Sequence, residues 1–371
     1  MPQQAPIICS VTNDLTYDQR MQRICNSLVD AGYCVQLIGR KKKHSAALRN
    51  EKFAQVRLPC FFEKGFGFYA EYNVRLFWYL LTHRAAAFYA VDLDTILPCL
   101  WISKLKRKPR LYDAHELFTE QKEICTRKWL HWFWLQIEKY AVRQYPHGYT
   151  VNTFIQQELN RRYGVNYGIV RNLPLLKTFD ANIPPPTNTL PVILYQGAVN
   201  EGRCFESLIP AMEHVDAQLI ICGEGNFFNQ TQQLIAQYNL SNKVILKGYV
   251  APTELRLLTP TAFCGVTLFE STGLNQYYSL ANRFFDYMMA GIPQICVNYP
   301  EYAAINHHLP VALLIEDTSV AAIAAALNKL LHDSVLYKSI QQNTLIAREQ
   351  LNWQAESVQL IAYWQRILPN Q

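Results

Sequence analysis

The residues best suited to chemistry are arginines and carboxylates that follow short apolar segments. Arg203 comes six residues after the strand-like "PVILYQG", and "NRFFDYMMAG" opens a helix-like segment. A guanidinium can bind a diphosphate through paired donors, and a helix start attracts anions through its unpaired N–H groups. We therefore predict a diphosphate site made of Arg203, Arg283, Asn282 and Gly197. Asp286, one turn into the helix, is predicted to accept hydrogen bonds from ribose hydroxyls. The alternative is a surface arginine near an ordinary helix start.

Two further strand-like segments end in glycine-containing turns. "AQLIICG" is followed by Glu224 and Gly225, and "KVILKG" ends at Gly248 before Tyr249. Backbone groups at such turns can approach a ligand closely, so Gly225, Gly248 and Tyr249 are predicted to contact a nucleobase. The sequence has neither an extended G-x-G-x-x-G motif nor a P-loop lysine motif, which argues against nicotinamide and P-loop sites.

Comparable residues follow strand-like segments in the first half. Asp18 and Arg20 come after "APIICSV", where Asp18 could accept hydrogen bonds from acceptor hydroxyls and Arg20 could bind an acceptor phosphate or the donor diphosphate. A helix-capping carboxylate and a surface arginine explain this pair equally well. His115 and Glu116 follow "RLYDA", and their position after a strand favours a catalytic role over a structural one.

Asp92 and Asp94 follow the strand-like "FYAV". One is interpreted as a site residue and the other as a helix cap, without a basis for choosing, and Asp94 is taken as a candidate acceptor contact. Pairs of carboxylates such as this "DLD" pattern bind metal ions in some proteins, but this pair lies in the other half of the chain from the predicted diphosphate site. We therefore expect no metal site, and no cofactor beyond a nucleotide-linked donor substrate.

The segments that position these residues alternate between strand-like and helix-like patterns. Such alternation indicates an α/β fold with parallel sheets, in which ligands bind at the carboxyl ends of strands. The polar segment 177–190, with three consecutive prolines, reads as a linker. We predict two doubly wound domains, an acceptor-binding domain over 1–176 and a donor-binding domain over 191–351. Residues 352–371 form an amphipathic helix that we expect to cross back to the first domain.

Composition bounds the class of protein. Half of the 371 residues are hydrophobic and 17% are charged, so large cores can form. No apolar run is long enough to span a membrane, no signal peptide is apparent, and the ten cysteines form no C-x-x-C pair, so we expect a cytoplasmic protein. Residues 1–176 hold 25 Lys and Arg against 14 Asp and Glu, whereas the remainder holds 10 against 15. The basic first half favours an anionic partner.

Two segments of the basic half, residues 60–84 and 127–139, mix aromatic residues with Lys and Arg, and residues 40–49 add a basic patch. Such segments are typical of membrane interfaces, so we expect peripheral contact with an anionic membrane at its inner face. Core helices with solvated flanks are the alternative. Nucleic acid is not expected as a partner, because no nucleic-acid-binding module is recognisable.

Several motifs together resemble glycosyltransferase family 4. "YQGAVNEGR", "IICGEGN", "VILKGYV" and "SLANRFFDYMMAGIPQI" stand in the order of its donor domain, and one subgroup usually reads "SLPNKLFEYMAAGIPVI". "TNDLTYDQRMQR", "VDLDTILP" and "YDAHELFTE" resemble loops of its partner domain. The resemblance spans nearly the whole chain. It implies a GT-B fold, in which two Rossmann-like domains face across a cleft, a nucleotide-sugar donor and retention of anomeric configuration.

The resemblance also assigns roles to individual residues. It supports Arg203 at the diphosphate, Asp286 at the ribose, and His115 or Glu116 facing the transferred sugar. The common family pattern has a first glutamate eight positions before Asp286, where this chain has Tyr278. Sugar contacts are therefore expected from Asn275, Tyr277 and Ser279. Ala281 replaces the usual proline of the subgroup.

These observations predict a metal-independent glycosyltransferase that moves a sugar from a nucleotide diphosphate to a hydroxyl of a glycan or lipid-linked acceptor, in polysaccharide or glycolipid synthesis. A GT-B nucleotide-sugar epimerase would use the same fold and donor without a separate acceptor. The missing first glutamate also leaves open a non-catalytic nucleotide-sugar-binding protein.

Overall fold

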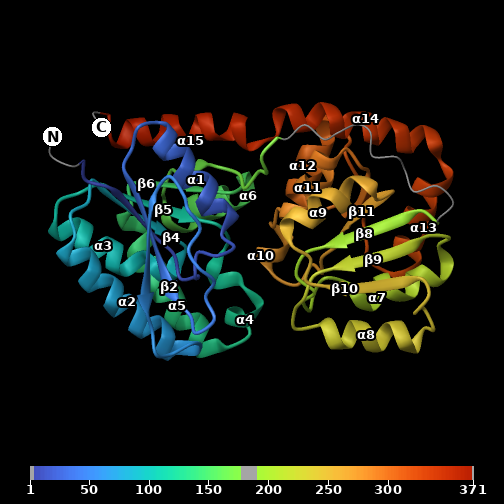
Figure 1. Cartoon of the computed structure of the whole chain (residues 1–371), viewed down its shortest axis with the longest axis horizontal. Helices are drawn as coiled ribbons and strands as arrows, with labels where there is room; N and C mark the ends of the chain where they lie inside the picture. Colours follow the sequence, from blue (N-terminus) through green and yellow to red (C-terminus); the bar gives the residue numbers. More distant parts are fainter. Residues whose placement is uncertain (1–3, 177–189, 370–371) are drawn as a thin grey trace. The chain divides into compact units, whose positions relative to one another are not determined.

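The chain folds into two units, each built on its own parallel sheet (Figure 1). The computed structural model describes residues 4–176 and 190–369. The first unit comprises residues 1–172 and 355–371, and the second comprises residues 173–354. The predicted linker, residues 177–190, lies outside the described residues except for Leu190.

The first unit holds a seven-stranded parallel sheet in the order β3-β2-β1-β4-β5-β6-β7. Strands β1 and β4 are buried along their whole length, as expected for a sheet covered on both faces by helices. The direction in which successive strands are added reverses between β1 and β4, which makes this the switch point of the sheet. The strands are β1 (Ile7–Ser10), β2 (Val35–Lys41), β3 (Ala54–Pro59), β4 (Ala87–Val91), β5 (Arg110–Ala114), β6 (His147–Thr150) and β7 (Gly168–Ile169).

The helices of the first unit begin and end at residues suited to those positions. Asp18 caps its helix by accepting a hydrogen bond from the N–H of Met21, and Asn152 caps another through the N–H of Ile155. Gly164 ends that second helix with a φ of +67°. The helices between the strands are α1 (Gln19–Asp30), α2 (Gly65–Thr82), α3 (Ile96–Leu105), α4 (Lys122–Cys125), α5 (Lys128–Ala141) and α6 (Thr153–Tyr163).

The second unit repeats this architecture with a six-stranded parallel sheet in the order β10-β9-β8-β11-β12-β13. Its switch point lies between β8 and β11. The strands are β8 (Val192–Gln196), β9 (Gln218–Cys222), β10 (Val244–Gly248), β11 (Cys264–Thr267), β12 (Gln294–Val297) and β13 (Leu313–Ile315). The helices are α7 (Phe205–Ala211), α8 (Phe228–Gln237), α9 (Pro252–Leu258), α10 (Leu274–Tyr277), α11 (Asn282–Ala290), α12 (Pro300–His308), α13 (Val320–His332) and α14 (Ser334–Gln350).

The last helix, α15 (Trp353–Ile367), returns the chain to the first unit, which confirms the predicted crossover. Trp364 is fully buried, with its ring centroid 5.7 Å from that of Tyr89. The hydroxyl of Tyr363 accepts a hydrogen bond from the N–H of Gly148 and donates one to the carbonyl of the same residue. These contacts fix the end of the chain on β4 and β6.

The sequence patterns did not predict β3 or α14. Strand β3 lies at the edge of its sheet, and its side chains are mostly half-buried, so it lacks a continuous apolar run. Helix α14 buries only Ile340, Thr344 and Ala347, which gives a weak apolar stripe. None of the described helices is long and apolar enough to span a membrane.

Candidate functional site

The switch point of the second unit holds the predicted diphosphate-binding residues. Ligands of open α/β sheets bind outside the carboxyl ends of the strands at such a point. Arg203 lies in the loop that follows β8, and Arg283 lies in the first turn of α11, which follows β11. Because β8 and β11 are neighbouring parallel strands, both arginines come to the same edge of the sheet.

The guanidinium groups of these two arginines stack on one aromatic ring. Cζ of Arg203 lies 4.4 Å from the ring centroid of Phe269, and Cζ of Arg283 lies 4.9 Å from the same centroid. Arg283 also lies 4.4 Å above the ring of Tyr195. Aromatic faces hold the cations in place without neutralising their charge.

Both arginines carry hydrogen-bonding capacity that the protein leaves unused. Nε of Arg203 and Nη1 of Arg283 are buried without a hydrogen-bond partner. Burial and the adjacent positive charge of Arg283 lower the pKa of Arg203. Within residues 4–176 and 190–369, neither side chain forms an ion pair with a carboxylate. An anion bound here would neutralise two like charges and supply the acceptors that are lacking.

Helix α11 begins beside these cations. Its N-cap is Ala281, whose methyl group cannot accept a hydrogen bond, so no side chain caps the first N–H groups. Asn282 is exposed, which shows that the helix start is accessible, whereas only 8% of Arg283 is exposed. Gly197 has a φ of +125°, and a Cβ placed there would lie 3.9 Å from the guanidinium of Arg283. The positive φ favours glycine at this position, which lies next to the cation.

Asp286 is held toward the end of β8 by hydrogen bonds. The side-chain amide of Gln196 donates to Oδ2 of Asp286 over 3.0 Å, and its carbonyl oxygen accepts from the hydroxyl of Thr259 over 2.8 Å. Gln196 is almost completely buried, so this orientation is fixed. A carboxylate can accept several hydrogen bonds at once, as contacts to hydroxyl groups would require. The opposite face of the helix is buried as predicted, through Phe284, Phe285, Met288 and Met289.

The predicted nucleobase contacts lie on the neighbouring loops of the same sheet edge. The N–H of Gly223 donates to the carbonyl of Gly248 over 2.7 Å, which ties the loop after β9 to the end of β10. A Cβ at Gly225 would lie 2.3 Å from the carbonyl oxygen of Val199, so this turn packs tightly on the loop after β8. Tyr249 follows β10 and is 56% exposed.

The predicted sugar contacts surround the short helix α10, which lies between β11 and α11. Asn275 is half-buried on this helix, and Ser279 is half-buried just after it. Tyr277 is partly exposed, with its ring centroid 5.1 Å from that of Tyr299. These residues share the loop that leads into the start of α11.

In the first unit, the corresponding arginine is already neutralised. Arg20, in the first turn of α1, donates to both carboxylate oxygens of Asp113 at 3.0 to 3.3 Å and to the carbonyl of Val170 at 3.1 Å. Asp113 is fully buried and also accepts from the hydroxyl of Tyr89 over 2.6 Å. Burial alone raises the pKa of Asp113, but Arg20 and His115 lower it to about 2. Arg20 therefore stabilises the interior of the first unit in this structure.

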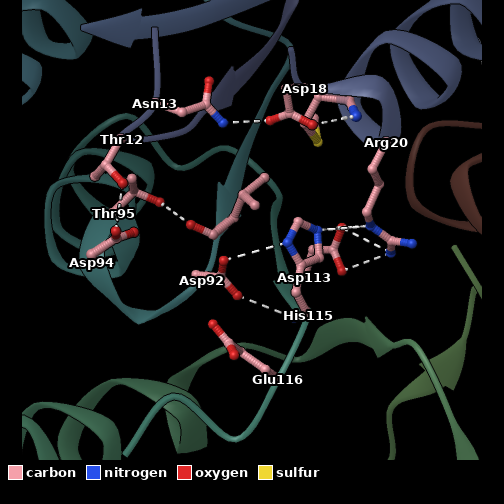
Figure 2. Close-up of polar contacts among 12 residues, drawn as sticks. Thr12, Asn13, Asp18, Arg20, Asp92, Asp94, Thr95, Asp113, His115 and Glu116 are labelled. Atoms are coloured by element: carbon pink, nitrogen blue, oxygen red, sulfur yellow. Dashed lines mark hydrogen bonds and ion pairs between the residues drawn. The ribbon is translucent and has the colours of Figure 1, made fainter. Parts of the chain in front are cut away.

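His115 lies between two carboxylates at the switch point of the first unit (Figure 2). Its Nδ1 is 3.3 Å from Oδ2 of Asp92, and its Nε2 is 3.1 Å from Oδ2 of Asp113. Burial alone lowers the pKa of His115, but the two carboxylates raise it to about 10. Nε of Arg20 is 2.7 Å from Nε2 of His115, so the imidazole has a partner whether that nitrogen carries a proton or not. The side chain is 22% exposed and remains accessible to a ligand.

Asp92 reaches His115 from a strained backbone. Its φ of 57° and ψ of 173° fall in a region that residues other than glycine rarely adopt. One carboxylate oxygen accepts from the backbone N–H of His115 over 3.1 Å, and the other faces the ring. No N–H of the following 3₁₀ turn, Leu93–Thr95, is capped by Asp92. Asp92 thus contacts His115 and does not cap the turn, although it stands at the cap position.

Asp94 does not act as a cap either, so the expectation of one cap in this pattern is wrong. The hydroxyl of Thr12 donates to Oδ2 of Asp94 over 2.6 Å. Burial and the charge of Asp92 raise the pKa of Asp94 to about 8. The carboxyl group thus lies close to the end of β1, where Thr12 follows the strand.

The remaining catalytic candidates have different surroundings. Asp18 caps α1, and its second oxygen accepts from the side-chain amide of Asn13 over 2.6 Å. Glu116 is half-buried next to His115 and accepts a hydrogen bond from the amide of Gln121. The structure brings His115, Glu116 and Asp92 together, whereas Asp18 belongs to the start of α1 (Figure 2).

Sequence reasoning missed residues that hold the site in place. The guanidinium groups of Arg203 and Arg283 stack on the rings of Phe269 and Tyr195. Gln196 orients Asp286, and Asp113 holds Arg20 and His115 in place. All four supporting residues stand in or next to the strand-like segments that were identified, and a polar residue at the end of such a segment is the signal that points to Gln196 and Asp113. In the described part of the chain, no three His, Cys, Asp or Glu side chains are arranged to hold a metal ion.

Known proteins resemble the chain in sequence and in structure. Residues 177–345 match the family described as "Glycosyl transferases group 1". An uncharacterised glycosyltransferase, YqgM of Bacillus subtilis (strain 168), is 21% identical over 279 residues, which cover 74% of this chain and 76% of that protein. The family match spans the segments that carry both switch-point arginines of the second unit, Arg203 and Arg283.

Solved structures resemble the chain over almost its full length. Sucrose-phosphate synthase of Thermosynechococcus elongatus is 16% identical with a TM-score of 0.80, covering 99% of this chain and 100% of that one. The Anabaena protein HepE in complex with UDP-glucose is 12% identical with a TM-score of 0.75, covering 98% and 100%. The chain therefore has the GT-B fold, and its second unit matches the group 1 glycosyltransferases.

Proposed function

We propose that the chain is a glycosyltransferase that moves a sugar from a nucleotide diphosphate donor to a hydroxyl group of a glycan or lipid-linked acceptor. The observation that carries this proposal is the pair of arginines, Arg203 and Arg283, that share Phe269 without a carboxylate partner in the described residues. Together with the uncapped start of α11, they supply a site for two negatively charged phosphate groups. The family match of the second unit supports the same conclusion.

The donor would be bound by groups that favour the departing diphosphate. Breaking the bond between sugar and phosphate leaves negative charge on the phosphate oxygens. Fixed donors aimed at that charge lower the barrier without a metal ion. Arg203, Arg283 and the N–H groups of α11 provide such donors, Asp286 receives the ribose, and the loops with Gly225, Gly248 and Tyr249 receive the base. We propose that no cofactor beyond the donor is needed.

The first unit would supply the acceptor side of the reaction. His115, held at both ring nitrogens by Asp92 and Asp113, would present a fixed positive charge beside the sugar hydroxyls, and Glu116 lies next to it. We propose that anomeric configuration is retained and that the departing phosphate helps to deprotonate the acceptor hydroxyl. The transferred sugar would meet Asn275, Tyr277 and Ser279 on the donor side, in place of the glutamate that Tyr278 replaces.

The exposed aromatic residues of the first unit support a lipid-linked acceptor at an anionic membrane. Phe61, Phe62, Trp129 and Trp132 are each more than half exposed. Such side chains suit a membrane interface when basic residues accompany them. We propose that the protein works on the cytoplasmic side of a membrane, as a peripheral protein in polysaccharide or glycolipid synthesis.

The experiment that tests this function measures nucleotide release from a panel of UDP-, GDP- and ADP-linked sugars, with and without alkyl glucosides as acceptors. Release that depends on an acceptor supports transfer. Conversion of the donor sugar without an acceptor would point to an epimerase. Tight binding without any turnover would point to the binding protein that the loss of the first glutamate suggests, and binding of none of these donors would remove the proposal.

A further inference from the structure

An apolar cavity of about 470 Å³ lies in the first unit, between α2, α3 and α5. This volume falls in the range of about 300–1,000 Å³ that is typical of small-molecule sites. Its walls are largely aromatic side chains, among them Phe66, Phe77, Trp78, Trp101, Phe133 and Trp134. Among the residues that line it, only Asp94, Asn73 and Tyr69 carry polar side-chain groups besides the indole N–H groups.

Contacts between aromatic rings fix the positions of the helices that form the walls of the cavity. The ring of Phe66 on α2 meets that of Phe133 on α5 edge to face, with centroids 5.6 Å apart. On the other side, Phe77 on α2 meets Trp101 on α3 at 6.4 Å. Edge-to-face pairs at these distances stabilise the packing of the helices. The cavity is therefore a built feature of three helices.

The mouth of the cavity is apolar as well. Phe66, Trp78 and Trp101 line it and are 56%, 59% and 45% exposed. Exposed apolar side chains that gather at one cavity are candidates for a binding site. It calls for a ligand that is itself apolar over most of its length.

The other end of the cavity reaches the polar centre of the unit. Asp94 lines the cavity and accepts a hydrogen bond from Thr12, which follows β1 (Figure 2). Asp92, two residues before it, contacts His115. A ligand in the cavity would therefore lead from an exposed aromatic mouth to the switch point of the sheet.

The charge of the three helices indicates what such a ligand carries at its ends. Helices α2, α3 and α5 hold four basic residues, Arg75, Lys104, Lys128 and Lys139, and two acidic ones. Both acidic residues are engaged: Glu71 accepts from backbone N–H groups and from Arg75, and Glu138 is buried with Thr119 and Tyr163 as donors. Because Arg75 is paired with Glu71, the three lysines set the charge of these helices, which favours a phosphate-bearing amphiphile and disfavours a second copy of the same basic face.

We propose that this cavity binds the hydrocarbon chain of a lipid-linked, phosphate-bearing acceptor, whose phosphate stays outside it, on the basic outer surface of α3 and α5. The proposal rests on the transferase function proposed above, and it narrows the acceptor to a class. Each methylene group that leaves water strengthens binding roughly fourfold when it is fully buried, so affinity should depend steeply on chain length.

The test uses the full chain and measures binding of hexyl, octyl and decyl phosphate by calorimetry, below the concentrations at which they aggregate. Affinity is expected to rise from hexyl to decyl phosphate, and inorganic phosphate is expected not to compete. Trp78→Ala, in the cavity wall, and Ala70→Trp, which fills the space, should each weaken decyl phosphate binding at least tenfold. Trp132→Ala is the matched control, because Trp132 is 62% exposed on α5 but lies outside the cavity lining.

Other results would overturn the proposal. Equal affinity for all chain lengths, or equal losses from Trp78→Ala and Trp132→Ala, would show that no cavity site exists. Binding to phosphatidylglycerol vesicles that both tryptophan variants weaken equally, without binding of alkyl phosphates, would identify a membrane-inserting face. Self-association that Trp78→Ala abolishes, again without alkyl phosphate binding, would identify an interface between copies. Nucleoside diphosphate binding is measured in parallel, and its loss would count against the donor site and leave the cavity standing.

Discussion

The two units share a topology but treat their switch-point arginines in opposite ways. Arg20 follows β1 and Arg203 follows β8, each the strand at the reversal of its sheet. Arg20 is 5% exposed and paired with a fully buried aspartate, whereas Arg203 has a second arginine beside it and no carboxylate partner in the described residues. The same residue type at the same topological position is thus structural in one unit and available for a ligand in the other. What decides the role is the charge that surrounds it.

The largest effect is expected from removing Arg20. Arg20→Met would leave the fully buried Asp113 with only His115 of its two cations, which should lower the free energy of unfolding of the first unit by about 3–5 kcal/mol. Arg203→Met should leave the stability of the second unit unchanged or raise it, because it removes one of two neighbouring positive charges. Chemical unfolding followed by tryptophan fluorescence reports on the first unit, which holds most of the tryptophans, and circular dichroism reports on both. Equal stability losses in the two variants would contradict the contrast between the units.

The reverse pattern is expected for nucleotide binding. Arg203→Met and Arg283→Met should each weaken binding of nucleoside diphosphates by about 10–100-fold, which corresponds to roughly 1.4–2.8 kcal/mol. Asp286→Asn should weaken the binding of nucleoside diphosphates less, because only the contacts to the ribose are affected. Titration calorimetry with UDP, GDP and ADP measures these losses. Arg256→Ala, an exposed arginine on α9, is the matched control, and a loss of the same size there would mean that general charge and not the site binds the nucleotide.

The contrast also explains what sequence reasoning reached in each unit. Strands such as β8 and the buried face of α11 were predictable, because continuous apolar runs and helical periodicity report burial directly. The positions of Arg203 after a strand and of Asp286 one turn into a helix followed from the patterns of the neighbouring segments. The pairing of Arg20 with Asp113 did not, because the two lie 93 positions apart and Asp113 belongs to a segment that reads as a buried strand. Such a partner becomes known only when the sheet is assembled.

A third experiment varies the pH, because the charged side chains at the switch point of the first unit form ion pairs. The pKa of His115 is raised to about 10, so its contribution to stability is fully present below its ordinary value near 6.5 and is lost as the pH rises through about 10. The free energy of unfolding of the first unit should therefore fall between pH 7 and 10, by up to about 3 kcal/mol.

Asp92→Asn removes one of the two carboxylates beside the ring and should bring the pKa of His115 down toward its ordinary value. NMR titration of the imidazole, identified by its loss in His115→Gln, measures this shift. His115→Gln should also flatten the alkaline fall in stability. If the fall persists unchanged in that variant, other groups cause it and the pairing of His115 is not what stabilises the unit.

The smallest effect concerns backbone strain, which both units place next to their site residues. Asp92 adopts a φ of 57° and a ψ of 173°, whereas Cys204, directly after Arg203, adopts 59° and 31° in the left-handed helical region. Residues other than glycine reach the second region at a lower cost than the first. Comparing glycine with alanine at each position isolates this cost, because both substitutions remove the side-chain contacts. We expect Asp92→Gly to be more stable than Asp92→Ala by about 1–2 kcal/mol, and Cys204→Gly to exceed Cys204→Ala by about 1 kcal/mol or less. Unfolding in urea measures both differences. If glycine stabilised position 204 as much as position 92, or more, then the backbone strain at Asp92, beside His115, would be no larger than the strain at Cys204, beside Arg203.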